Sequence, residues 1–143
     1  MRHLTLSAIG VLVAICVPGC VDQPSSPGGD CLCTEEFVQV STTVVDEQGL
    51  PVTGITIQVT MTRTGRVLDS SRLLQGPEPG RYAIFNDAFK GLVAPENRDA
   101  GEEIRVVGSL KAPIFDETFR VGVPGECRCH VAKVSGPDTV TVH

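Results

Sequence analysis

Alternating apolar and polar positions predict a strand, a turn and a second strand between residues 38 and 61. In residues 38–45 every second side chain is β-branched, so these side chains share one face of an extended chain. Residues 55–61 repeat the alternation, and Gly49, Pro51 and Gly54 between the two segments are typical turn residues. Because a two-stranded unit cannot bury its own apolar face, we expect further strands to cover it.

The rest of the chain shows the same period of two and no long helical pattern. Further strands are predicted at residues 81–85, 104–110, 117–123, 127–134 and 139–142, with a short one near 67–68. A single helical turn is expected at residues 87–90, because Gly91 and Pro95 would end a longer helix. The predicted fold class is an all-β sandwich of seven or eight strands.

Length and composition narrow the possible classes of protein. The 143 residues suit a single domain, and the aromatic residues are only five Phe and one Tyr, with no Trp. The formal net charge is −5, and no basic patch with interleaved aromatic residues is present. We therefore expect no nucleic-acid partner. No cofactor is predicted either.

The N-terminus reads as a targeting segment. Residues 4–17 form an apolar run of 14 residues behind Arg2 and His3, which is shorter than the roughly 20 residues that a membrane-spanning helix needs. The run ends in Val-Pro-Gly-Cys at residues 17–20, which resembles the signal of a bacterial lipoprotein, although Pro18 departs from the small or apolar residue usual there. The alternative is an ordinary secretory signal with a coincidental cysteine.

The lipoprotein resemblance implies a division of the chain and a location. Residues 1–19 would be the signal peptide, and Cys20 would become the lipidated first residue, carrying acyl groups such as palmitate. Residues 20–30, rich in Pro, Ser and Gly, would be the flexible tether, and residues 31–143 the folded domain. The protein would be exported and held by its lipid in the cell envelope, at the outer membrane or the cell surface.

Four cysteines remain after the signal and the lipid site are set aside. They form two Cys-x-Cys pairs, Cys31 with Cys33 and Cys127 with Cys129. In an oxidising compartment these pairs predict two disulfide bonds that staple the two ends of the domain together. Both pairs lie where strands are expected to begin, which favours Cys31 with Cys127 and Cys33 with Cys129. Four cysteines allow three connectivities, and the sequence leaves the choice open.

A metal site or a redox-active pair is the competing interpretation of these cysteines. Cys31, Cys33, Cys127 and Cys129, with His130 beside them, could supply thiolate and imidazole ligands. Structural zinc usually takes pairs with two to four intervening residues, and Cys-x-Cys is tighter than that. Disulfides are therefore the favoured prediction, with no resident metal.

Two short segments resemble a known family of β-sandwich domains. Residues 45–55, Val-Asp-Glu-Gln-Gly-Leu-Pro-Val-Thr-Gly-Ile, are similar to the opening of carboxypeptidase regulatory-like (transthyretin-like) domains, and residues 79–82, Pro-Gly-Arg-Tyr, are similar to a later Gly-x-Tyr step. The resemblance implies an immunoglobulin-like or transthyretin-like sandwich, a fold that hosts many functions. Hydrolases of hydroxyisourate in this family end in Tyr-Arg-Gly-Ser, whereas this chain ends in Thr-Val-Thr-Val-His at residues 139–143.

Residues suited to catalysis are few. After the signal only His130 and His143 remain, and we expect His130 to be an exposed strand residue. The acids around residues 87–103 are expected to form a solvated loop rather than a calcium site, since no EF-hand spacing is present. The predicted function is a non-catalytic binding or structural module, with another envelope protein as the candidate partner. The alternative is a small metal-binding or redox lipoprotein acting through the cysteines and His130, and a hydrolase is a weaker third option.

Overall fold

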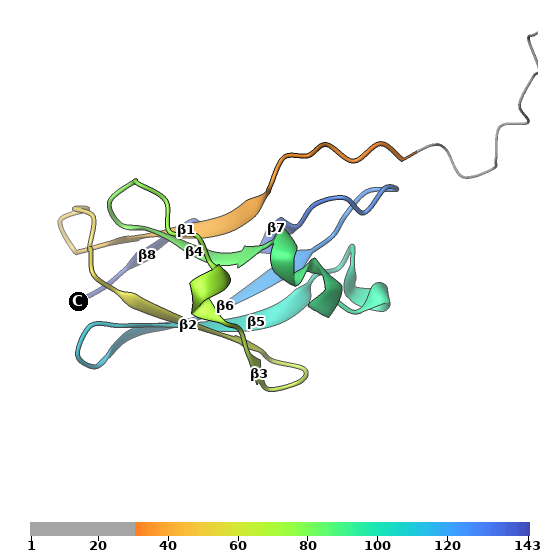
Figure 1. Ribbon diagram of the computed structural model, residues 1–143. Coiled ribbons are helices and arrows are strands. Elements are labelled where there is room, and N and C mark those ends of the chain that lie inside the picture. The colour runs from red at the N-terminus through yellow and green to blue at the C-terminus, as the bar shows by residue number, and fades with distance from the viewer. Residues whose placement is uncertain (1–30) are drawn as a thin grey trace, which may run out of the picture. The chain divides into compact units, whose positions relative to one another are not determined.

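Two β-sheets make up residues 31–143, the part of the chain that the computed structural model describes (Figure 1). One sheet has the strand order β4-β1-β8, and the other has the order β3-β2-β5-β6-β7. Strands account for 42% and helices for 11% of the described residues, which confirms the predicted all-β sandwich. The strands are β1 (Gln39–Val45), β2 (Thr56–Met61), β3 (Arg66–Val67), β4 (Arg81–Asn86), β5 (Glu102–Ser109), β6 (Pro113–Gly122), β7 (Ala132–Ser135) and β8 (Thr139–Thr141).

Most neighbouring strands are antiparallel, and one pair is parallel. Strand β1 pairs antiparallel with β4 and parallel with β8, where Val44 lies opposite Val140. In the larger sheet, β2 pairs with β5 and β5 with β6 along most of their lengths. The chain crosses from the second sheet to the first between β7 and β8. This crossing brings the C-terminal strand beside β1 (Figure 1).

The core lies between the two sheets and follows the alternation read from the sequence. In β1 the buried positions are Val40, Thr42 and Val44, and in β2 they are Ile57, Val59 and Met61. The largest completely buried apolar side chains are Phe85, Phe119, Met61, Ile84 and Ile104. Burial of apolar surface at about 25 cal/mol per Å² is the main contribution that holds the two sheets together.

Three short 3₁₀ helices occupy the connections: η1 (Ser70–Arg72), η2 (Asp87–Leu92) and η3 (Pro95–Asn97). The single turn expected at residues 87–90 corresponds to η2, which continues to Leu92. Asn86 caps η2, because its side chain accepts a hydrogen bond from the backbone N–H of Ala88. Within residues 31–143, no helix combines the length and the apolar character needed to cross a membrane.

The strand predicted at residues 127–134 is wrong in its first half. Residues 127–131 form a loop, and β7 begins only at Ala132. Arg128 has a φ of 51°, a left-handed conformation that an extended strand excludes. The backbone N–H of Val131 bonds to the side chain of Asp87 instead of a neighbouring strand. Strand β6 is longer than expected, since it begins at Pro113 rather than near residue 117.

The loops gather at two opposite ends of the sandwich (Figure 1). We call the first the disulfide end; it contains residues 31–38, 87–101 and 123–131. We call the second the hairpin end; it contains the turns at residues 46–54, 76–80 and 110–112. The predictions for residues 1–30, which include the signal peptide, the lipidated Cys20 and the tether, lie outside the described residues.

Candidate functional site

Two disulfide bonds fasten the first described residues to the loop before β7. Cys31 is bonded to Cys127 and Cys33 to Cys129, with Cα atoms 5.2 and 5.3 Å apart. Each bond joins residues separated by 96 positions in the sequence. This is the connectivity that the sequence favoured. Because both bonds start from the same Cys-x-Cys segment, they also fix its register against residues 127–129.

The alternative metal site at these cysteines has lost its sulfur ligands. A disulfide sulfur carries no thiolate charge, and the thiolate is the form that binds zinc or copper. His130 has both ring nitrogens engaged by other side chains. Across residues 31–143, no group of three or more His, Cys, Asp or Glu side chains is placed to hold a metal ion.

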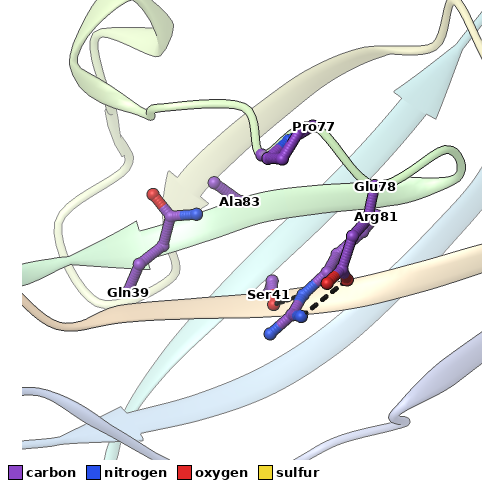
Figure 2. Close-up of a pocket in the computed structure, with 7 residues that line it drawn as sticks. Gln39, Ser41, Pro77, Glu78, Arg81 and Ala83 are labelled. Carbon is purple, nitrogen blue, oxygen red and sulfur yellow. Dashed lines mark hydrogen bonds and ion pairs between the residues drawn. The ribbon is translucent and has the colours of Figure 1, made fainter.

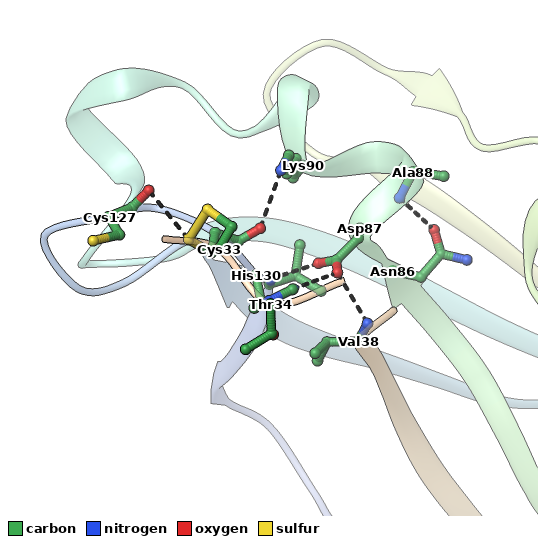
Figure 3. A network of polar contacts seen from close by, with 11 residues as sticks. Cys33, Thr34, Val38, Asn86, Asp87, Ala88, Lys90, Cys127 and His130 are labelled. Carbon is green, nitrogen blue, oxygen red and sulfur yellow. Dashed lines mark hydrogen bonds and ion pairs between the residues drawn. A yellow bond between two sulfur atoms is a disulfide. The ribbon is translucent and has the colours of Figure 1, made fainter. Parts of the chain in front are cut away.

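Asp87 is the centre of the polar contacts at the disulfide end (Figure 3). It follows β4 directly and begins η2. One carboxylate oxygen, Oδ1, accepts a hydrogen bond of 2.8 Å from the backbone N–H of Val131. The other, Oδ2, accepts one of 2.9 Å from the N–H of Val38 and lies 2.7 Å from Nδ1 of His130. One side chain thus joins the start of β1, the end of β4 and the loop before β7.

The charge state of Asp87 follows from these contacts. Burial of the carboxylate acts to raise its pKa, but the hydrogen bonds from His130, Val38 and Val131 outweigh burial, so the pKa of Asp87 lies below its ordinary value. An ionised carboxylate can only accept hydrogen bonds. The Nδ1 of His130 must therefore carry a proton, and this N–H donates a hydrogen bond to the carboxylate of Asp87.

The second ring nitrogen of His130 faces Thr34. Its Nε2 lies 2.9 Å from the hydroxyl oxygen Oγ1 of Thr34, which is exposed and follows Cys33 directly. When His130 is neutral, Nε2 has no proton, so the hydroxyl donates to it. A hydroxyl, an imidazole and a carboxylate are thereby joined in series, in the order that serine hydrolases use for their nucleophile, base and orienting acid.

His130 does not occupy the environment that the sequence suggested. It lies in the loop before β7 rather than in a strand, and its side chain is 25% exposed. The expectation of an exposed strand residue is therefore wrong. Asp87 holds the loop in this position by taking up the Val131 N–H, which would otherwise be the first donor of a longer β7.

Two cationic side chains, Lys90 and Arg128, also stabilise the loop formed by residues 123–131. The Nζ of Lys90 donates to the carbonyl oxygen of Cys129 at 3.0 Å. The guanidinium of Arg128 makes two hydrogen bonds of 2.9 Å to the carboxylate of Asp99, and Nη1 also donates to the carbonyl of Val123 at 3.1 Å. The conformation of residues 123–131 is thus fixed from both sides.

A second buried carboxylate lies nearby. The side chain of Glu102 is only 1% exposed, and it accepts hydrogen bonds from Arg63 at 2.8 Å, from Asn97 at 3.0 Å and from the N–H of Ala94 at 3.2 Å. Burial acts to raise the pKa of Glu102, but these hydrogen bonds bring it below the ordinary value. Asp87 and Glu102 are structural anchors, so the expectation of a wholly solvated acidic loop is wrong.

The hollow drawn in Figure 2 lies at the surface of β1 and β4, beneath the turn that carries Pro77 and Glu78. It measures about 140 Å³. Its one cation, Arg81, donates 2.8 Å hydrogen bonds to Oγ of Ser41 and to the carboxylate of Glu78. The charge in this hollow is therefore already neutralised. We assign it no role.

No family model matches the chain, and no similar curated protein or solved structure was found. The resemblances to lipoproteins and to carboxypeptidase regulatory-like domains therefore stay predictions. Sequence reasoning singled out Cys31, Cys33, Cys127, Cys129 and His130, and the structure brings all five together. Sequence reasoning missed the association of Thr34 and Asp87 with these five residues, because no local sequence pattern indicates that association.

Proposed function

We propose that this protein is a lipid-anchored component of the cell envelope whose β-sandwich is a non-catalytic binding or structural module. Cys20 would carry the lipid, residues 21–30 would form the tether, and the sandwich would contact another envelope protein. The proposal needs no cofactor.

One observation carries the non-catalytic part of the proposal: the cysteines and Asp87, which could take part in catalysis, instead hold the fold together. All four cysteines at the disulfide end are bonded to one another. Both oxygens of Asp87 accept backbone N–H groups. Buried backbone donors need such partners, and removing one costs about 1–3 kcal/mol. These groups stabilise a rigid platform, and a platform presents surfaces rather than a reactive centre.

The hairpin end offers the surface best suited to a protein partner. Leu50 is 61% exposed and Leu110 is 52% exposed, and each lies beside a turn at this end. The first described residue, Cys31, lies at the opposite end, bonded to Cys127. The hairpin end therefore lies at the far side of the sandwich from the residue that would continue into the tether (Figure 1). The buried centre of a protein–protein interface is more apolar than the rest of the protein surface, and Leu50 and Leu110 would supply apolar contacts there.

The anchor is tested by Cys20→Ser in the exported protein. Loss of the acylated residue should release the protein from the membrane fraction or leave its signal peptide uncleaved. Fractionation and the mass of the mature N-terminus report both outcomes. A variant that fractionates and migrates like the parent would show that Cys20 is not the anchor.

The partner is tested by photo-crosslinking in intact cells. A photoreactive residue at position 50 or 110 should give a discrete adduct with another envelope protein. The matched control is position 32, since Leu32 is also apolar and 91% exposed but lies at the disulfide end. Equal adducts from all three positions, or none from 50 and 110, would contradict a specific contact through the hairpin end.

The series Thr34–His130–Asp87 favours a second candidate function, hydrolysis of an ester or amide. In such a reaction His130 Nε2 would take the Thr34 proton as Oγ1 attacks the substrate carbonyl and would return it to the leaving group, while Asp87 stabilises the imidazolium. The distances of 2.9 and 2.7 Å suit this transfer. A shallow open hollow of about 500 Å³, lined by residues 124–132, lies beside His130.

A fluorophosphonate reagent, which bonds covalently to activated hydroxyls, separates the two candidates. If the protein is a hydrolase, the reagent should label Thr34, and His130→Gln should abolish the label. We expect no label on Thr34. We also expect Thr34→Ala to leave crosslinking from position 110 unchanged. Stoichiometric labelling that depends on His130 would replace the binding module with the hydrolase.

A further inference from the structure

Three cationic side chains line a single small hollow at the disulfide end. The hollow is bounded by Lys90, Gly91, Arg98, Val123 and Arg128, and its volume is about 170 Å³. That is below the range of about 300–1,000 Å³ that is usual for drug-sized ligands. Only a small ligand, or one small group of a larger molecule, fits inside.

The charge of this hollow stands out in an acidic protein of net charge −5. Elsewhere in residues 31–143 most cations are already paired with a carboxylate within 4 Å. Such pairs are Arg63–Glu102, Arg81–Glu78, Arg105–Asp116, Arg120–Glu103 and Lys133–Asp138. In the hollow, Arg128 has Asp99 as its partner. Among the described residues no carboxylate lies within that distance of Lys90 or Arg98, so the hollow keeps an excess of positive charge.

Hydrogen-bond donors remain free on the same three side chains. Lys90 has three N–H donors and uses one, on the carbonyl of Cys129. Arg128 has five and uses three, on Asp99 and Val123. The side chain of Arg98 makes no hydrogen bond within residues 31–143. A ligand rich in acceptor oxygens could therefore bind without breaking a contact of the protein.

Contacts within the protein restrain the backbone segments that carry these three cations. The N–H of Val123 donates to the carbonyl of Arg98 at 2.8 Å. Arg128 lies between two disulfide-bonded cysteines, in a left-handed conformation with a φ of 51°. Lys90 is tied to the same loop through Cys129. Positions fixed in this way lower the entropy lost on binding.

We propose that Lys90, Arg98 and Arg128 form a binding site for a phosphate group. Phosphate offers three or four acceptor oxygens and up to two negative charges, and guanidinium groups bind it through parallel hydrogen bonds.

The phosphate is either free or carried by a lipid headgroup. The lipid source rests on the proposed anchor: Arg128 follows Cys127, which is bonded to Cys31, and the ten residues 21–30 would span at most about 35 Å from Cys20.

The first test is a titration of residues 20–143 carrying Cys20→Ser, exported behind an ordinary cleavable secretory signal so that the disulfides form. Calorimetry with inorganic phosphate at constant ionic strength should give a saturable signal. Lys90→Gln combined with Arg98→Gln should weaken binding at least tenfold. The matched control is Arg66→Gln with Lys111→Gln, two cations outside the hollow that also lack a carboxylate partner, and it should change the affinity less than twofold. No saturable binding, or equal losses in both pairs, would overturn the proposal.

The second arm separates the two sources of phosphate. The same unacylated chain is sedimented with vesicles of phosphatidylcholine alone or with phosphatidic acid added. Sedimentation that needs both phosphatidic acid and the Lys90/Arg98 pair would assign the site to a headgroup, whereas a response to inorganic phosphate alone would assign it to the free ion. Because this chain carries no lipid, a failure of the Cys20 anchor leaves both readouts intact. The two proposals therefore fail separately.

Discussion

Asp46 and Asp87 show how differently the two ends of the sandwich are built. Each aspartate accepts hydrogen bonds from two backbone N–H groups. Those of Asp46, at the hairpin end, come from residues two and four positions away, at 2.9 and 2.8 Å. Those of Asp87, at the disulfide end, come from residues 49 and 44 positions away, at similar distances. The same chemistry closes a local turn in one place and joins distant segments in the other.

The difference extends beyond the two aspartates. At the hairpin end, Glu78 and Arg81 form an ion pair three residues apart, and Gly49 takes a positive φ of 78° within its turn. At the disulfide end, two covalent bonds link residues 96 positions apart. The contact over the same separation at the hairpin end is not covalent, and it joins Glu47 to His143 at 2.7 Å. A local contact restrains a few residues, whereas a long-range contact also restrains the unfolded chain or the overall topology. The disulfide end should therefore dominate the stability of the domain.

Removing both disulfides is the most severe test of this comparison. A bond that closes a loop of almost 100 residues contributes about 4–5 kcal/mol in the chain-entropy model. We expect replacement of all four cysteines by Ser to lower the free energy of unfolding by several kcal/mol. Replacing only Cys33 and Cys129 should cost about 1 kcal/mol or less, because the Cys31–Cys127 bond closes nearly the same loop. Denaturant unfolding of the variants measures both; equal losses in the two would contradict the shared-loop argument.

Substitution of the two aspartates makes the comparison directly. Asp87→Ala leaves the N–H groups of Val38 and Val131 without their acceptor, and we expect a loss of about 2–4 kcal/mol. Asp46→Ala frees N–H groups that water can reach, so we expect a loss of about 1 kcal/mol or less. Equilibrium denaturation of both variants provides the measurement. Similar losses would mean that the sequence separation and burial of the bonded groups do not matter here.

The contrast also explains what the sequence could and could not predict. The turns of the hairpin end could be predicted because Gly49, Pro51 and Gly54 determine the conformation of their own neighbours in the sequence. The alternation in β1, β2 and β5 was legible because each strand buries one face. The first half of the strand predicted at residues 127–134 failed for the opposite reason. A side chain more than 40 residues away takes the N–H of Val131, and no local pattern encodes that contact.

The candidate sites follow the same rule. The cysteine pairing was favoured because both pairs lie where strands were expected to begin, as in parallel neighbours. The pairing is confirmed, although both pairs lie in loops rather than at strand starts. Thr34 and Asp87 meet His130 only through the packing of three separate segments, and the phosphate site gathers Lys90, Arg98 and Arg128 in the same way. Each of these residues looks ordinary in its own stretch of sequence. Only the tertiary structure brings these residues together.

Acid sensitivity gives the smallest and most specific test of the comparison. The pKa of Asp87 is lowered in the folded protein, so between that value and the ordinary value of about 3.9 the unfolded chain binds more protons than the folded one. The stabilisation from the ionised carboxylate is therefore complete above the ordinary pKa and is lost as the pH falls through the folded value. Asp87→Asn removes this group, so its free energy of unfolding should fall less steeply below about pH 4 than that of the parent.

Glu102 provides the internal control for this pH dependence. Its pKa is lowered too, so part of the acid sensitivity should persist in Asp87→Asn and fall further when Glu102→Gln is added. The pKa values of Asp69 and Asp116 are also lowered, so these two carboxylates keep a share of the acid sensitivity in the double variant. The two carboxylates bond to different backbone and side-chain donors, so their contributions should be close to additive. Denaturant titrations from pH 2 to 7 on the parent, both single variants and the double variant measure the slopes. An Asp87→Asn profile parallel to that of the parent would mean that the carboxylate is not held ionised by His130, Val38 and Val131.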